Sequence, residues 1–246
     1  MHPAATDGFW QDFAPMPPRR SWRTAYPARM PDGSALWLPL RDLGETAVAG
    51  LIANQTSFAV QDRLVGWLAE RAAPFGADIV VGLPTLGHAV APALARALGH
   101  PRWAAAGYSR KLWYEERLSV PIASITTPDS RRLWLDPRVL AWLEGRRVLL
   151  VDDVLSTGRS IRAGLALLAA AGIRPVAVAA LMAQTTRWRA GWDPRLPVVS
   201  AFATPLFRRA ADGSWVEDEA WTSTCTIRGC AHARSARRAG WRRSTC

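Results

Sequence analysis

A chain of 246 residues, 49% of them hydrophobic, is long enough for one sizeable core with a smaller lobe. It contains no apolar run long enough to cross a membrane and no stretch typical of a secretory signal, so we expect a cytoplasmic protein that does not bind membranes. The net charge is +11, but residues 221–246 hold six arginines and no acid, which leaves +5 for the rest of the chain.

The N-terminal segment, residues 1–45, is predicted to carry a small β-hairpin. Residues 21–30 and 35–40 have the composition of two strands, and Pro31, Asp32 and Gly33 form the turn between them. A hairpin so far from the main sheet in sequence suits a small hood over an active site. The alternative is that the hairpin is only a peripheral addition at the edge of the core.

Residues 46–208 are predicted to form the core. Residues 48–52 and 57–71 are expected to be helices, and the second has a clear apolar face. Residues 78–82 are expected to be the first buried strand, and residues 88–98 the helix that follows it.

A glycine-bearing loop joins this strand to its helix. It consists of Pro84, Thr85, Leu86 and Gly87. Backbone N–H groups at the start of a helix attract anions, so this loop is a candidate anion site. His88 comes next, and we expect it to be a packing residue rather than a catalyst, although a histidine can serve as either.

Two cations follow the next predicted strand, residues 103–108. They are Arg110 and Lys111, the only lysine of the chain, and they could neutralise a departing phosphate group or form an ordinary basic turn. Residues 112–128 then show no periodicity. Long connections of this kind are often lids over active sites.

Short elements are expected between the lid and the next core strand. Residues 122–125 and 132–135 could pair as an extension of the lid. A short helix is predicted from Asp136 through Leu143, and Gly145 ends it.

The most informative stretch is a buried strand that ends in two acids. Residues 148–151 are all apolar, as in a parallel sheet covered on both faces, and Asp152 and Asp153 follow. Residues 156–160 then form a loop of hydroxyl groups and glycine before a helix over 161–168. Such a loop suits a phosphate, and the acids suit sugar hydroxyls or a Mg²⁺-bridged ligand. The chain has no Walker A pattern, which argues against ATP bound in the P-loop manner.

A further buried strand is predicted over residues 175–182, and a last one over 198–202. Residues 184–188 lie at the carboxyl end of the former, and their tryptophan could stack on a base or simply pack.

Residues 209–246 are predicted to be a basic tail without regular structure. All three cysteines lie there, and Cys225, Cys230 and His232 lack the spacing of a zinc site. We do not expect nucleic acid as a partner, although a basic tail is able to contact it without sequence preference.

Residues 148–160 resemble the phosphoribosyl-pyrophosphate (PRPP) signature of type I phosphoribosyltransferases. The resemblance implies an α/β fold, in which helices flank a five-stranded parallel sheet and a small hood covers the base. It implies that Asp152 and Asp153 contact the ribose 2′- and 3′-hydroxyls. The residues that would cradle the 5-phosphate are Ser156, Thr157, Gly158, Arg159 and Ser160.

The same resemblance assigns roles to the other loops. The 84–87 loop, with Arg110 and Lys111, would hold pyrophosphate, although Leu86 stands where many relatives carry Arg. The sequence Tyr114-Glu115-Glu116 is similar to the lid of adenine phosphoribosyltransferases, which makes Glu115, Glu116 and Lys111 the candidate catalytic residues. The candidates for base binding are Val154, Gln184 and Trp188.

The resemblance therefore implies transfer of a 5-phosphoribosyl group from PRPP to a nitrogenous base, with a purine favoured, in nucleotide salvage. Mg²⁺ would be bound through PRPP, with Asp152 and Asp153 as candidate ligands, and the protein would be a homodimer. The alternative function is a transcriptional regulator that binds PRPP without transferring it. A hydrolase or lyase that acts on a phosphorylated sugar is a third class.

Overall fold

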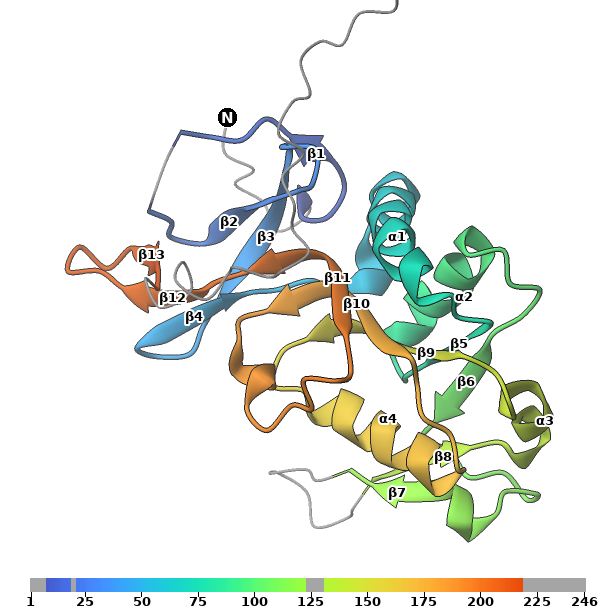
Figure 1. Ribbon diagram of the computed structural model, residues 1–246. Helices are drawn as coiled ribbons and strands as arrows, with labels where there is room; N and C mark the ends of the chain where they lie inside the picture. Colours follow the sequence, from blue (N-terminus) through green and yellow to red (C-terminus); the bar gives the residue numbers. More distant parts are fainter. Residues whose placement is uncertain (1–7, 19–20, 123–130, 219–246) are drawn as a thin grey trace, which may run out of the picture.

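Five parallel strands form the centre of the larger of two sheets in the computed structural model, which describes residues 8–18, 21–122 and 131–218 (Figure 1). The order across the sheet is β11-β10-β9-β5-β6, and all four pairings between these strands are parallel. Their bounds are Ile79–Gly82 (β5), Ala104–Gly107 (β6), Val148–Leu155 (β9), Ala177–Gln184 (β10) and Val198–Thr204 (β11). The expected five-stranded parallel sheet is confirmed. Its carboxyl-terminal edge is where such sheets bind ligands.

Two antiparallel strands extend this sheet beyond β6. They are β8 (Arg132–Leu135), which pairs with β6, and β7 (Ser119–Pro121), which pairs with β8. A paired extension is therefore present, but its first strand lies before residues 122–125, and 123–125 are outside the described residues. The segment 112–128 is thus not wholly irregular, since its middle part is anchored to the sheet.

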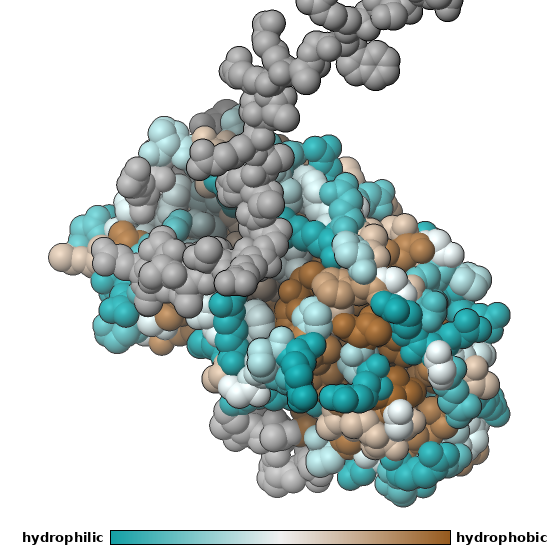
Figure 2. Space-filling model, in the orientation of Figure 1, coloured by the Kyte–Doolittle hydropathy of each residue, from teal (hydrophilic) through white to brown (hydrophobic). Residues whose placement is uncertain are grey.

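Helices cover both faces of the larger sheet. α1 (Phe58–Ala72) and α2 (Gly87–Ala97) lie on one face, and α4 (Arg159–Ala170) lies on the other (Figure 1). Along β9 the side chains alternate accordingly: Leu149 and Val151 share a core with α1 and α2, and Val148 and Leu150 share a core with α4. Figure 2 shows hydrophobic residues in the middle of this view, over the core.

The remaining helices are short. They are η2 (Ala53–Gln55), η3 (Ala73–Phe75), η4 (Glu116–Leu118), η5 (Pro137–Val139), α3 (Leu140–Leu143) and η6 (Arg187–Arg189). No helix of the described residues is long and apolar enough to span a membrane.

A second sheet forms the hood, and it contains the expected hairpin. β2 (Ala25–Arg29) and β3 (Ala35–Asp42) pair antiparallel around the predicted turn, and β1 (Phe13–Ala14) pairs with the other edge of β3. The prediction of a helix over residues 48–52 is wrong. That region contains β4 (Thr46–Ala49), which pairs with β3.

The hood is completed from the far end of the chain. β12 (Leu206–Arg209) pairs with β4, and β13 (Trp215–Glu217) pairs with β12. The Tyr26 hydroxyl donates to Glu217 Oε1 at 3.0 Å, and the Tyr26 ring lies 4.7 Å from that of Phe207. Residues 209–217 therefore belong to the hood rather than to the tail expected from residue 209 onward. The three cysteines, His232 and the arginines of 221–246 lie outside the described residues.

Candidate active site

Two adjacent carboxylates, Asp152 and Asp153, lie near the carboxyl end of β9. Asp152 is 5% exposed, and its Oδ1 accepts the Asp153 backbone N–H at 3.0 Å. Asp153 is only partly buried. Asp153 is therefore the more accessible of the two acids.

The N-terminus of α2 lies directly against Asp152. A Cβ atom on Gly87 would stand 3.0 Å from Asp152 Oδ1 and 3.1 Å from the Val151 carbonyl oxygen. A side chain at position 87 would force the helix away from β9, so glycine permits this close approach. The start of α2 is thereby placed next to the acid pair.

Burial raises the pKa of Asp152 well above its usual value, and the charge of Asp153 raises it further. Burial also raises the pKa of Asp153. Neither carboxylate has a cationic side chain among these causes, so the ionised pair is poorly compensated within the protein. A ligand that brings hydroxyl donors or a cation would supply that compensation.

In the 156–160 loop, residues 156–158 connect β9 to α4, while Arg159 and Ser160 are the first two residues of the helix, which begins earlier than predicted. Gly158 has a φ of 80° and precedes the first residue of α4, and no side chain caps that helix start. A Cβ on Gly158 would come 2.7 Å from the Arg162 guanidinium, which donates to the Thr157 carbonyl at 2.9 Å. Thr157, Arg159 and Ser160 are exposed. The loop therefore presents hydroxyls and uncapped helix N–H groups, as an anion site requires.

The 84–87 loop lies between β5 and α2. The Pro84–Thr85 peptide bond is cis, and the Pro84 carbonyl accepts a 3.1 Å hydrogen bond from the Tyr108 hydroxyl. Leu86 packs partly buried against the core, so it takes no part in charge neutralisation. His88 bonds the Ala106 carbonyl through Nε2 at 2.9 Å, as expected of a packing residue.

Tyr108 is a site residue that sequence reasoning missed. It follows β6 directly, and burial together with the charge of Asp152 raises its pKa, while Arg131 opposes the shift. Its hydrogen bond to the Pro84 carbonyl places the Tyr108 hydroxyl at the 84–87 loop. The signal in the sequence was its place at the carboxyl end of a core strand.

The charged residues of the lid are paired with one another. Arg110 contacts Glu116 at 2.7 Å, and Glu115 contacts Arg117 at 2.6 Å, in each case between exposed side chains. Lys111 lines a separate hollow of about 500 Å³ with its neighbours. Within the described residues, none of Arg110, Lys111, Glu115 and Glu116 forms a hydrogen bond or ion pair with the 84–87 loop or the 156–160 loop.

The side chains that are candidates for base binding make most of their contacts inside the protein. Gln184, the last residue of β10, is 8% exposed, and both ends of its amide are hydrogen-bonded. Trp188 is 9% exposed and packs edge-on against Trp192 with ring centroids 5.5 Å apart, so it is a core residue rather than a surface for stacking. Val154 is partly buried and packs against the core on the side of α1 and α2.

Arg187 is a second residue that sequence reasoning missed. Its exposed guanidinium lies 3.4 Å from Ser156 Oγ and 3.3 Å from Thr185 Oγ1. Thr185 has a φ of 62°, a left-handed conformation that is rare for a β-branched residue, and it turns the chain at the end of β10. This turn places Arg187 beside the 156–160 loop.

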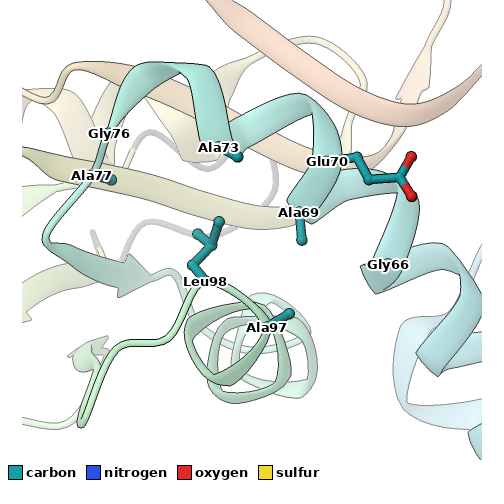
Figure 3. Close-up of a pocket in the computed structure, with 8 residues that line it drawn as sticks. All are labelled: Gly66, Ala69, Glu70, Ala73, Gly76, Ala77, Ala97 and Leu98. Atoms are coloured by element: carbon teal, nitrogen blue, oxygen red, sulfur yellow. The ribbon is translucent and has the colours of Figure 1, made fainter. Parts of the chain in front are cut away.

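A hollow of about 550 Å³ lies elsewhere, between the C-terminal ends of α1 and α2 (Figure 3). Small residues dominate its lining, and the Glu70 carboxylate points away from it. It offers no cation for a phosphate. This hollow is therefore not a candidate for the sugar-phosphate site.

A metal ion at the acid pair would need further ligands. Among the described residues there is no group of three or more His, Cys, Asp or Glu side chains that could hold a metal. Asp152 and Asp153 supply hard carboxylate oxygens of the kind Mg²⁺ prefers, and Mg²⁺ usually completes its shell with water and substrate phosphates. The residues present fit an ion that arrives with a phosphorylated substrate.

Comparison with known proteins matches residues 49–194 to the model of one family, described as the phosphoribosyl transferase domain. Among solved structures, the adenine phosphoribosyltransferase of Thermoanaerobacter pseudethanolicus is similar at 23% identity and a TM-score of 0.51, over 59% of this chain and 81% of that one. The APRTase of Giardia lamblia, solved with 9-deazaadenine, is similar at 17% identity and a TM-score of 0.50, over 64% and 93%. No curated protein sequence matches the chain.

Proposed function

Because the chain belongs to the phosphoribosyltransferase family, we propose that it transfers the 5-phosphoribosyl group of PRPP to a ring nitrogen of a purine base. In this reaction the bond between ribose C1 and the pyrophosphate oxygen breaks, and a bond between C1 and the base nitrogen forms. Pyrophosphate leaves with the bonding electrons, and the base nitrogen loses its proton.

One observation supports this proposal most: the acid pair lies between the two loops that are candidates for anion binding. Gly87 packs against Asp152 on one side, and β9 leads into the 156–160 loop on the other. PRPP has a phosphate at one end, a pyrophosphate at the other and two hydroxyls between them. The order of the three sites along the carboxyl edge of the sheet matches that order of groups.

Each part of the site would contribute binding or orientation. The 156–160 loop would hold the 5-phosphate, with Arg187 as an additional cation. Asp152 and Asp153 would accept hydrogen bonds from the ribose 2′- and 3′-hydroxyls, and backbone N–H groups of the 84–87 loop would bind the pyrophosphate. When bound with PRPP, Mg²⁺ would neutralise part of the pyrophosphate charge and so make it a better leaving group.

Although residues 119–121 pair with β8, the charged side chains of the lid are available to a ligand because their ion pairs are exposed. The Arg110–Glu116 ion pair is exposed, and exposed pairs contribute only about 0–1 kcal/mol. Pyrophosphate would therefore compete with Glu116 for Arg110. We propose that lid closure brings Arg110 and Lys111 to the pyrophosphate and Glu115 or Glu116 to the base.

The preference for a purine is supported by the similarity of the lid sequence to adenine phosphoribosyltransferases and by a fold shared with two solved structures of that activity. Nucleotide salvage, a cytoplasmic location and the homodimer belong to the same proposal. Sedimentation of the purified chain tests the dimer.

The test is to incubate the protein with PRPP, Mg²⁺ and a panel of purine and pyrimidine bases, and to measure pyrophosphate release. We expect release with at least one purine. The double variant Asp152→Asn with Asp153→Asn should abolish it, whereas Asp62→Asn, an exposed acid of α1, should not. PRPP binding without release for any base would contradict the transferase and favour the regulator.

A further inference from the structure

We propose that Gln184 is a positioning residue that couples the hood to the 156–160 loop. This inference rests on the proposed function for its consequence in turnover, but the contacts that carry it belong to the free protein. They were not expected from the sequence, which placed Gln184 at the base.

Gln184 joins two distant parts of the chain. Its Nε2 donates to the Ala49 carbonyl at 2.7 Å, across 135 positions of sequence, and its Oε1 accepts from Ser156 Oγ at 2.5 Å, across 28 positions. Ala49 is the last residue of β4, a hood strand, and Ser156 is the first residue of the 156–160 loop. One amide therefore spans the hood and the loop.

The Gln184 amide has little freedom to change its hydrogen-bond partners. Gln184 is 8% exposed, and a buried amide is stable only when its donor and acceptor are paired. If the hood strand moved, Gln184 would follow the Ala49 carbonyl or leave it unpaired. Either change would alter the hydrogen bond that the Ser156 hydroxyl donates to Gln184.

The loop itself is held by few side chains. Within the described residues, those that bond it from outside are Gln184, Arg187 and Arg162. Arg187 belongs to η6, and Arg162 of α4 links the loop to η6 because it also donates to the Trp188 carbonyl at 2.9 Å. Gln184 is the one of these three that reaches the hood.

Coupling of this kind has a consequence for two ligands. A phosphate that orders the loop would, through Gln184, also order the hood strand β4. By linkage, a base that orders the hood would raise the affinity for the phosphate by the same factor. Gln184 would thus make binding of donor and acceptor cooperative.

The experiment compares Gln184→Met, which preserves length and removes both hydrogen bonds, with Gln11→Met. Gln11 is the control, because its amide nitrogen also donates to backbone carbonyls, those of Phe9 and Gln55, which lie outside the 156–160 loop. For Gln184→Met we expect affinity for ribose 5-phosphate, measured by calorimetry, to fall about tenfold. Hydrogen exchange of the free protein should become faster both in residues 46–49 and in residues 156–160.

Ser156→Ala is the second variant, in case Gln184→Met does not fold. It removes only the hydrogen bond between Gln184 and the loop, yet it should still speed hydrogen exchange in residues 46–49. Gln184→Met should also raise KM for PRPP much more than it lowers kcat, and its effect and that of Ser156→Ala should be less than additive.

Unchanged hood exchange in Ser156→Ala would overturn the proposal, as would a folded Gln184→Met with wild-type affinity for ribose 5-phosphate. The transferase proposal can fail separately. If no base is converted but the exchange and affinity changes appear as stated, the coupling stands and the transfer reaction does not.

Discussion

At the scale of single residues, the site depends on charges that the protein itself leaves uncompensated. Asp152 is buried, and burial raises the pKa of its carboxyl well above the unfolded value of about 3.9. The folded state therefore holds this proton more tightly than the unfolded state. The stability that this tighter proton binding contributes is present at pH values below the pKa of the unfolded state. It is lost as the pH rises through the raised pKa of the folded state.

Asp152→Asn should consequently raise the Tm at pH 7, because asparagine carries no charge to desolvate and its Oδ1 can still accept the Asp153 N–H. The gain should shrink as the pH is lowered toward 4. Thermal unfolding at both pH values measures this, and binding of PRPP should meanwhile weaken by about tenfold or more. An unchanged Tm at pH 7 would show that burial does not penalise the charge.

Arg187 tests the phosphate end of the site. Arg187→Leu should raise the KM for PRPP about tenfold, since a charge-assisted hydrogen bond contributes about 1.5–3 kcal/mol. Arg195→Leu is the matched control, because Arg195 is exposed on the same connection and its side chain pairs, among the described residues, only with Asp193. Equal KM values for the two variants would remove Arg187 from the site.

At the scale of elements, the close contact of α2 with β9 decides where the 84–87 loop lies. A Cβ at position 87 would meet Asp152 Oδ1 at 3.0 Å and backbone atoms of β9 at 3.1 Å. Gly87→Ala should therefore destabilise the protein by about 1–3 kcal/mol. Gly66→Ala, in the middle of α1 with open space around it, should instead stabilise by about 0.5–1 kcal/mol. Urea unfolding of both variants measures the contrast, and a Gly87→Ala variant as stable as Gly66→Ala would contradict the contact.

At the scale of the whole molecule, the hood is made from both ends of the described chain. β13 holds the buried Trp215 and the Glu217 that bonds Tyr26. A chain ended at residue 208 should thus have a lower Tm and lose turnover, whereas one ended at 218 should keep both. Thermal unfolding and pyrophosphate release measure this, and a fully active 1–208 chain would show that β13 is dispensable.

The sequence by itself determined the parts whose signals are local. The apolar run of β9, the adjacent acids, the glycine-bearing loops and the amphipathic α1 and α4 each lie within about 15 neighbouring residues, so their physical reasons can be read in place. The resemblance of residues 148–160 to the PRPP signature rests on such local signals, and the five-stranded parallel sheet was implied by that resemblance.

Only the tertiary structure decided what depends on distant partners. β4 is a strand because β3 and β12 bond it, and nothing in the sequence of residues 46–49 indicates a partner some 160 positions away. Gln184 and Trp188 lie inside the protein, and Tyr108 and Arg187 contact the loops of the candidate site, because segments distant in sequence meet in the fold. Hydrogen-bond partners and burial are properties of the packed chain, because they are set by which segments meet in space.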